Sequence, residues 1–149
     1  MAITTVLFDL DGTLLPMDQD VFTTGYFKSL CKKVAPLGYE PEKLVKAIWA
    51  GMAAMVKNDG SETNEKAFWK FFATIFGDRV YGDMDVFNDF YANDFKNAKI
   101  FCGYDPKAAM AVRSLKDAGY RVALATNPIF PSAATEERIR WTDLEPDDF

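Results

Sequence analysis

The chain is organised around the segment VLFDLDGTLL, residues 6–15. Residues 3–8 are almost all β-branched or apolar, which is typical of a strand covered on both faces in a parallel sheet. Two carboxylates, Asp9 and Asp11, follow at the end of this strand, where such sheets carry their functional residues. Gly12 permits the sharp turn that comes next, because glycine accepts backbone angles that other residues resist.

The spacing of the two acids predicts a site for a divalent cation. If the strand continues, Asp9 and Asp11 point to the same side, since strand side chains alternate. Two bare carboxylates this close repel each other, so they need a cation or a shared proton. Magnesium fits, because it takes oxygen ligands from one or two carboxylates, waters and a substrate phosphate. With magnesium in place, Asp9 can attack phosphorus and Asp11 can move the proton of the attacking or leaving oxygen.

The structural alternative is a strand end with solvated acids in a turn, and an isolated Asp-x-Asp would favour it. The whole string, an apolar run followed by Asp-x-Asp-Gly-Thr-Leu, is more specific and favours the functional interpretation. An EF-hand calcium loop fits poorly, since Thr13 stands where a third oxygen ligand is needed and Leu14 stands where glycine is needed.

At these residues the chain resembles the haloacid dehalogenase (HAD) superfamily, whose first motif matches Asp9-Leu10-Asp11-Gly12-Thr13. The resemblance implies an α/β fold, a Rossmann-like parallel-sheet core with an all-α cap inserted after the first motif. It implies that Asp9 is the nucleophile that becomes an aspartyl-phosphate and that Asp11 is the general acid/base. It also implies Mg2+ as the cofactor, held by Asp9 and Asp11, the latter also through its backbone carbonyl, and a small phosphorylated substrate.

Composition excludes several classes of protein. Apolar residues make up 49% of the 149 residues and charged residues 26%, which is typical of a globular chain. The net charge of -5 argues against a nucleic-acid partner. An anionic substrate must therefore be attracted by a local metal and backbone N–H groups rather than by the overall field. The chain has 0 histidines, so histidine general bases and histidine metal sites are excluded.

The two cysteines, Cys31 and Cys102, form no CxxC pair and are interpreted as free buried thiols in a reducing compartment. No stretch reaches the ~20 apolar residues needed to cross a bilayer, so no membrane association is expected. The N-terminus leads straight into the first strand without a signal-type segment. The expected location is the cytoplasm.

Residues 17–98 are predicted to form an all-helical insertion of about four helices with short connections. The remaining residues, 1–16 and 99–149, are predicted to form the α/β core. The aromatic stripes of this insertion are interpreted mainly as core packing. The resemblance implies that the insertion is a cap that opens, closes and helps to select the substrate. The predicted stripes are Phe22, Tyr26, Leu30 and Val34; Leu44, Ile48, Met52 and Met55; residues 68–76; and Phe87, Phe90, Tyr91 and Phe95.

A second buried strand is predicted at residues 120–125, after a helix that starts at Asp105-Pro106. It ends at Thr126-Asn127-Pro128, an ordinary turn whose hydroxyl, amide and N–H groups can also hold phosphate oxygens. In the family, a Ser or Thr at this point binds the phosphoryl group, which implies that role for Thr126. Asn127 and Gly12 are assigned to phosphate binding with it. A helix over about residues 131–141 follows.

The chain departs from the family after this point. The resemblance calls for a basic third motif and an acidic fourth motif, and neither is visible. Lys99 and Lys107 precede the second strand, which is the wrong place for the basic motif. Arg138 and Arg140 lie in the helix after it and are expected on a solvated face. Without a basic residue, stabilisation of the phosphoryl transition state is incomplete.

Two parallel strands are too few to cover both faces and both edges of a sheet. Either the chain is the N-terminal part of a longer protein, which we favour, or a second copy or partner chain supplies the missing strands. Residues 144–149 are expected to lead into a third strand. Asp147 and Asp148 within them follow no strand, so they are not assigned to the metal.

The sequence therefore predicts a magnesium-dependent phosphatase for a small phosphomonoester, weakly active or inactive as this isolated chain. A phospho-aspartate signalling receiver is one alternative, although its phosphoacceptor follows a later strand and it lacks such a helical insertion. A non-catalytic assembly module that completes its sheet with another chain is the other. Phosphomutase and dehalogenase chemistry also remain open, although family dehalogenases lack the second aspartate.

Overall fold

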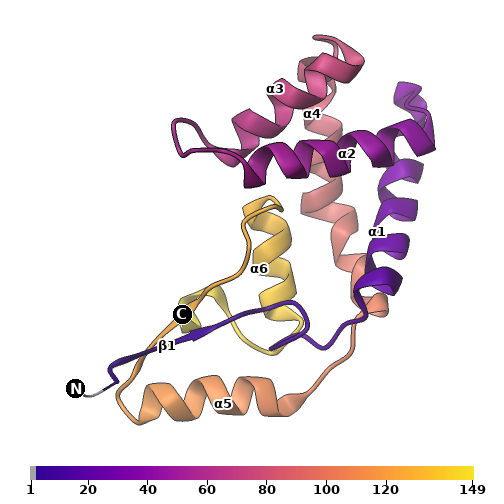
Figure 1. The fold of residues 1–149 in the computed structure, drawn as a ribbon. Helices are drawn as coiled ribbons and strands as arrows, with labels where there is room; N and C mark the ends of the chain where they lie inside the picture. Colours follow the sequence, from indigo (N-terminus) through magenta and orange to yellow (C-terminus); the bar gives the residue numbers. More distant parts are fainter. Residues whose placement is uncertain (1–2) are drawn as a thin grey trace. The chain divides into compact units, whose positions relative to one another are not determined.

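The computed structural model describes residues 3–149 (Figure 1), so the first two residues of the predicted segment 1–16 lie outside the described part. The chain divides into two compact units. The α/β unit comprises the chain up to Gly25, Lys96–Asn127 and Ser132–Phe149, and the helical unit comprises Tyr26–Phe95 and Pro128–Pro131. These divisions lie near the predicted ones at residues 16/17 and 98/99, but not at the same positions.

The α/β unit is built on two parallel strands. β1 (Thr5–Phe8) pairs with β2 (Arg121–Leu124) in a register that runs from Thr5 opposite Arg121 to Phe8 opposite Leu124. One further hydrogen bond, 2.7 Å from the Ala125 N–H to the Phe8 carbonyl, continues the pairing past β2. The predicted α/β class is present with an incomplete sheet, since these two strands form the whole of it within residues 3–149.

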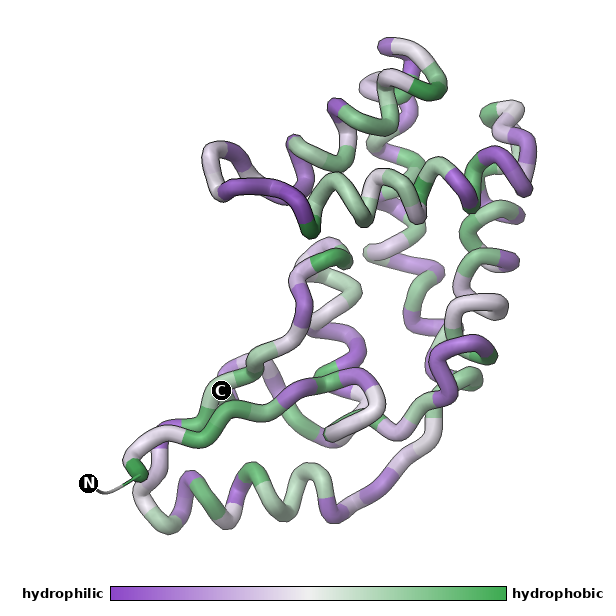
Figure 2. Tube along the Cα trace, viewed as in Figure 1, coloured by the Kyte–Doolittle hydropathy of each residue, from purple (hydrophilic) through white to green (hydrophobic). Residues whose placement is uncertain are grey.

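β1 is less covered than its sequence predicted. The side chains of Ile3 and Leu7 are 75% and 65% exposed, so the expectation of a strand buried on both faces is wrong for this chain. Figure 2 shows the hydrophobic residues along this segment. The apolar pattern requires a covering layer, and the described residues supply none over Leu7. This outcome fits the sequence argument that two strands cannot bury both faces.

The helix α5 (Pro106–Asp117) packs against β2, and residues next to its two ends explain where it starts and stops. The Asp105 side chain accepts a hydrogen bond from the Lys107 N–H at 2.9 Å, which caps the helix start. Gly119 follows the helix with a φ of +86°, a backbone angle that favours glycine. The predicted start, end and following strand are all found here.

The end of the chain is not extended. After α6 (Ser132–Arg140), residues Pro146–Asp148 form a short 3-10 turn, and the expected lead-in to a third strand stays a prediction. The Glu145 N–H donates to Asp148 Oδ2 at 2.9 Å and closes a reciprocal capping box. An ion pair of 3.1 Å between Lys116 and Asp148 holds the turn against α5.

The two chain segments that lead into and out of the helical unit run beside each other within the α/β unit. The Gly103 N–H donates to the Pro16 carbonyl at 2.6 Å, and Met17 forms an antiparallel bridge with Cys102. A side chain at Gly103 would meet the Pro16 Cβ at 3.1 Å, so the close approach uses the small residue.

The helical unit is formed by helices in chain order with short connections (Figure 1). Its first helix, α1, begins in the α/β unit, because the division at Gly25 falls inside it. The other helices are α2, α3 and α4, followed by a π-helical and a 3-10 segment. The bounds are α1 Gln19–Val34, the 3-10 turn Ala35–Leu37, α2 Pro41–Val56, α3 Asn64–Phe76, α4 Val80–Asp89, the π turn Phe90–Asp94 and the 3-10 segment Phe95–Phe101.

Aromatic side chains form the core of this unit, as the interpretation of the stripes predicted. Phe72 is fully buried and meets Tyr39 and Phe87 at ring centroid distances of 6.1 and 6.0 Å. The predicted fourth helix is not continuous, because α4 ends at Asp89 and the chain continues as a π turn. A π turn changes the number of residues per turn, and Phe90 and Phe95 both remain buried across it.

A short piece of the loop after β2 belongs to the helical unit. Phe130 packs on Tyr26 and Phe95 with ring centroids 5.5 and 6.1 Å apart. The Asn64 side-chain amide donates to the Pro128 carbonyl at 3.1 Å. The sequence prediction had assigned this piece to the core, where its chain neighbours lie, because no local pattern reveals which unit it contacts.

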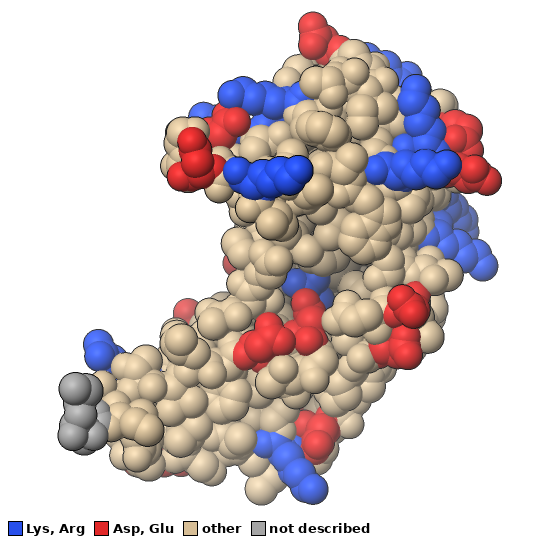
Figure 3. Space-filling model, viewed as in Figure 1, with Lys and Arg blue, Asp and Glu red and all other residues tan. Residues whose placement is uncertain are grey.

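None of the helices described is long and apolar enough to cross a membrane. On the face drawn in Figure 3, the helical unit carries Lys or Arg beside Asp or Glu, and most of the α/β unit is uncharged. Basic side chains do not gather into a single patch on this face.

Candidate functional site

The predicted acids and the predicted phosphate-binding residues lie at one edge of the two-stranded sheet. Asp9 follows β1 directly, and Thr126 lies two residues beyond β2. In the register that pairs Phe8 with Leu124, Asp9 lies opposite Ala125, and Thr126 is the next residue, so both Asp9 and Thr126 follow the carboxyl ends of the strands. The parallel pairing therefore brings to one end of the sheet two residues that are 117 positions apart in the sequence (126 − 9).

A compact turn presents Asp11. The Gly12 N–H donates to the Leu15 carbonyl and the Leu15 N–H donates to the Leu10 carbonyl, both at 2.9 Å. Leu10, Leu14 and Leu15 are buried, so the turn is anchored by its leucines. Gly12 has a φ of +81°, which explains glycine at this position. Its N–H is already used within the turn, and its assignment to phosphate binding stays a prediction.

Asp9 is exposed and has one oriented oxygen. The Thr13 hydroxyl donates a hydrogen bond of 3.1 Å to Asp9 Oδ2. This contact leaves Asp9 accessible while restricting the rotation of its carboxylate. The motif assigns Thr13 no role of its own, and its place four residues after Asp9 is the signal for this contact.

Asp11 lies deeper than Asp9 and faces a cation. Its Oδ1 is 3.2 Å from Nε of Arg138, and the two side chains are 23% and 1% exposed. Burial raises the pKa of the Asp11 carboxyl, the neighbouring guanidinium of Arg138 lowers it, and the charge of Asp9 raises it. Burial is the largest of these effects, so the net direction for the pKa of Asp11 is upward.

The predicted position of Arg138 is wrong. It was expected on a solvated face of α6, and it is 0% exposed. Ala134, one helical turn earlier, and Ile139 are buried with it, so Arg138 lies on the inward face of the helix. Arg140 is exposed and pairs with Glu136 and Glu145, as a solvated face predicts. The spacing from Ala134 and the need of the acid pair for a cation were the signals that could have identified Arg138.

The side chains at this edge suit a small hard cation. Asp9 and Asp11 supply carboxylate oxygens, which are the protein ligands that magnesium takes one or two at a time, completing its shell with waters and a substrate phosphate. Within residues 3–149 there is no group of three or more His, Cys, Asp or Glu side chains that could hold a metal. Asp9 and Asp11 alone do not form a closed protein cage, so a magnesium ion held by them would need waters or substrate oxygens to complete its shell.

Cys102 lies close enough to this site to be influenced by it. Burial raises the pKa of the Cys102 thiol to about 11, with the charge of Asp11 adding to the shift and that of Arg138 opposing it. Both cysteines are free, as the sequence predicted, and both are half-buried.

Thr126 is half-buried and Asn127 is exposed. The chain immediately after them enters the helical unit at Pro128. Their position at the carboxyl end of β2 is as predicted, and their role in phosphate binding stays a prediction. The acids Asp147 and Asp148 are in the 3-10 turn at the end of the chain, where Asp148 pairs with Lys116.

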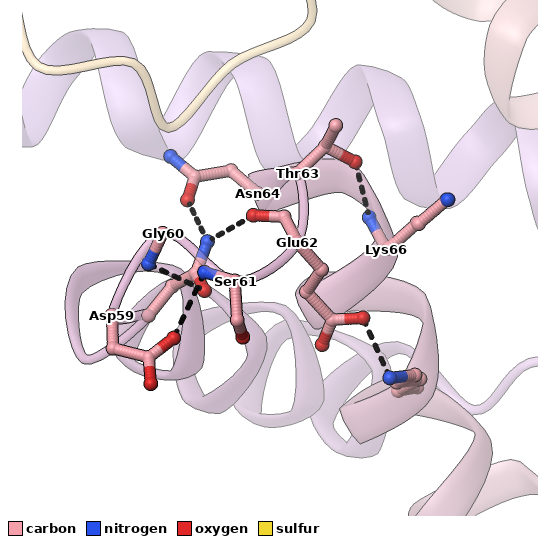
Figure 4. Close-up of polar contacts among 9 residues, drawn as sticks. Asp59, Gly60, Ser61, Glu62, Thr63, Asn64 and Lys66 are labelled. Carbon is pink, nitrogen blue, oxygen red and sulfur yellow. Dashed lines mark hydrogen bonds and ion pairs between the residues drawn. The ribbon is translucent and has the colours of Figure 1, made fainter.

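The helical unit has a separate shallow hollow where α2 leads into α3. Figure 4 shows that its loop is closed by its own polar contacts. The Asn58 side-chain amide donates to the Glu62 carbonyl and to Asn64 Oδ1 at 2.9 Å each, and Lys70 forms a 2.6 Å ion pair with Glu62. These polar groups are used in shaping the loop. The hollow is lined by Ala54, Lys57, Asn58, Asp59, Ser61, Glu62, Ala67, Lys70, Phe71 and Thr74.

Comparison with known proteins gives one finding. The sequence model of the haloacid dehalogenase-like hydrolases matches residues 6–139. No curated protein and no solved structure matches the chain. The matched range begins in β1 and ends in α6, so it contains both aspartates, the whole helical unit, β2 and Arg138.

Proposed function

Because the chain belongs to the haloacid dehalogenase-like hydrolase family, we propose that its site serves magnesium-dependent hydrolysis of a small phosphate monoester through phosphorylated Asp9. One observation carries the proposal. In the parallel register Asp9 lies opposite Ala125, the residue before Thr126, and Asp11 follows in the turn after Asp9. Carboxylates and a hydroxyl at these positions are the groups that phosphoryl transfer to an aspartate requires.

The two aspartates divide the reaction. Asp9 is exposed and oriented by Thr13, so its carboxylate attacks phosphorus and the bond from phosphorus to the ester oxygen breaks. Asp11, half-buried beside it, gives a proton to the departing oxygen. Water then attacks the phosphorus of the aspartyl-phosphate, loses its proton to Asp11 and releases phosphate and free Asp9. A raised pKa helps Asp11 to be protonated when the ester oxygen leaves.

Asp9 and Asp11, with the backbone carbonyl of Asp11, are the groups that would hold Mg2+. When bound, the ion supplies positive charge for the phosphoryl oxygens. Thr126, Asn127 and Gly12 are the residues proposed to bind the phosphate. The chain has a net charge of -5, so this local binding must overcome the overall field.

We assign the helical unit the role of the cap that selects the substrate. Its aromatic core makes it a compact body with its own packing, which a moving cap requires. A cytoplasmic location is proposed from the free cysteines and is consistent with the absence of a membrane-spanning helix among the described residues.

We expect low activity from this chain by itself. The basic group of the third motif is missing from the sequence, and Arg138, the cation nearest the acids, is too buried to reach a phosphate. The proposal that the chain is the N-terminal part of a longer protein accounts for both the missing group and the uncovered strands. The exposed sheet supports a second candidate, an assembly module completed by another chain. The family match favours a hydrolase over a signalling receiver.

The test is phosphate release from p-nitrophenyl phosphate with magnesium and with EDTA. We expect activity that is slow and lost in EDTA, and that falls by at least about 100-fold in Asp9→Asn and Asp11→Asn. Asp147→Asn is the matched control, because Asp147 is an exposed acid away from the sheet edge. Turnover that survives in Asp9→Asn would exclude Asp9 as the nucleophile, and a wild-type kcat above about 1 s⁻¹ would contradict the expected weakness.

A further inference from the structure

The ion pair between Arg138 and Asp11 is a part of the site that the proposed reaction leaves unused. Of the charged residues that the structure describes, Arg138 is the only buried one. Burying a guanidinium is costly unless a partner compensates it. Its carboxylate partner at 3.2 Å is one of the two acids of the site.

We propose that Arg138 is a positioning residue for hydrolysis, whose guanidinium fixes the Asp11 carboxylate beside Asp9. The proposal rests on the function proposed above, since it concerns the same pair of aspartates. Arg138 supplies a cation beside two acids that would otherwise repel each other. The sequence alone offers only a metal ion or a shared proton for this purpose. Arginine remains charged at every working pH, so the counter-ion is permanent.

The packing of α6 holds this cation still. Ala134 and Ile139 are 0% and 5% exposed on the same helix, and Trp141 just after it is 2% exposed. Trp141 also donates its indole N–H to Glu137 at 3.0 Å, which ties the end of the helix to its preceding turn. A guanidinium fixed by a packed helix restricts Asp11 more than a surface lysine would.

Burial also shows what Arg138 does not do. Its side chain is 1% exposed, so a substrate phosphate cannot touch it, and any effect on the reaction passes through Asp11. Asp11 Oδ1 is buried with the guanidinium while the side chain as a whole stays 23% exposed. Oδ2 is therefore the oxygen left for proton transfer. Thr13 performs the matching task for Asp9, so each acid has its own orienting partner.

The first experiment compares Arg138→Met, Arg138→Lys and Arg140→Met in phosphate release with magnesium. Arg140→Met is the matched control, since Arg140 lies on the same helix, is ion-paired and is exposed. We expect Arg138→Met to lower kcat by about 10–100-fold with KM within about threefold, and Arg138→Lys to recover part of the loss. Equal kcat values for Arg138→Met and Arg140→Met, or a loss confined to KM, would overturn the proposal.

The second experiment does not need turnover, so it separates the positioning role from the proposed function. Thermal melts of Arg138→Met, Asp11→Asn and the double variant form a cycle. We expect Arg138→Met to lower Tm by about 10 °C and the double variant to lose less than the sum of the single losses. Strictly additive losses would show that the two side chains are not coupled and would overturn the proposal.

The carbon-13 NMR chemical shift of the Asp11 carboxyl reports directly on the positioning role of Arg138. It should move in Arg138→Lys, which keeps the charge but not the geometry, and stay in place in Arg140→Met. An unchanged Asp11 signal in Arg138→Lys would overturn the proposal even if Arg138→Met fails to fold. A wild-type chain without phosphatase activity, but with a coupled cycle and a shifted signal, would contradict the proposed function and leave the positioning role supported.

Discussion

At the scale of single residues, the acids of the candidate site differ in how deeply they are buried and in which side chains contact them. Asp11 lies beside Arg138, and a half-buried acid and a buried base are each costly unless they are together. Asp9 is different: it is exposed and is only oriented by Thr13. Two acids one residue apart therefore have different surroundings, which is how a protein gives similar carboxyl groups different roles.

Tyr39 provides a pH-dependent test at this scale. Burial, with the hydrogen bond that its hydroxyl donates to Asp83 at 2.7 Å, raises the pKa of Tyr39 to about 12. A pKa raised in the folded state adds stability that is present below the unfolded pKa of about 10 and is lost as pH rises through about 12. Wild-type Tm should therefore fall more steeply between these pH values than the Tm of Tyr39→Phe.

Thermal melts of both proteins from pH 7 to pH 11 measure this difference. At pH 7, Tyr39→Phe should be less stable by about 1 kcal/mol, because Asp83 loses its donor. Other tyrosines titrate equally in both proteins and cancel in the comparison. Parallel pH profiles would contradict a raised pKa for Tyr39.

At the scale of elements, two helical glycines differ in their surroundings, since one lies against a neighbouring helix and the other faces open space. A Cβ at Gly51 of α2 would lie 2.6 Å from Cδ2 of Phe68 in α3, whereas one at Gly82 of α4 would meet nothing within 4 Å. Both glycines are inside helices, so alanine gains about 1 kcal/mol of helix propensity at either. Only at Gly51 does it also meet an aromatic ring.

Alanine should consequently have opposite effects at the two positions. Overpacking costs about 1–3 kcal/mol, so Gly51→Ala should lower the free energy of unfolding by about 1 kcal/mol. Gly82→Ala should raise it by about 0.5–1 kcal/mol. Urea unfolding of the three proteins gives these differences. Stabilisation by Gly51→Ala would mean that Phe68 moves aside at little cost.

At the scale of the whole molecule, the sheet is the unfinished part. Leu7 is 65% exposed on β1, and in the described part of the chain β1 has one neighbouring strand, β2. An apolar strand with an open edge invites pairing with another chain. This open edge is the feature on which the proposed assembly module rests.

Self-association should therefore depend on Leu7. We expect light scattering to show concentration-dependent association of the wild type, and Leu7→Glu to weaken it at least tenfold, which corresponds to about 1.4 kcal/mol. Val21→Glu is the control, because Val21 is 52% exposed but lies on α1. A wild type that stays monomeric at all concentrations would argue against the assembly module.

The agreement between sequence and structure was greatest where the signal is local. Asp105-Pro106 predicts a helix start by capping and by the fixed φ of proline, and α5 begins at Pro106. The run before Asp9 predicts a strand, and the family match confirms the resemblance that the motif suggested. Local geometry depends on neighbouring residues alone, so it can be determined from them.

Tertiary contacts alone decided the rest. Arg138 looks like any surface arginine of a charged helix until packing places it opposite Asp11, which is far away in sequence. The loop at Phe130 joins the helical unit through contacts with Tyr26 and Phe95, which no local pattern contains. Residues 3–8 carry the pattern of a covered strand, but burial requires covering atoms, and a sequence pattern specifies the need for cover without supplying it.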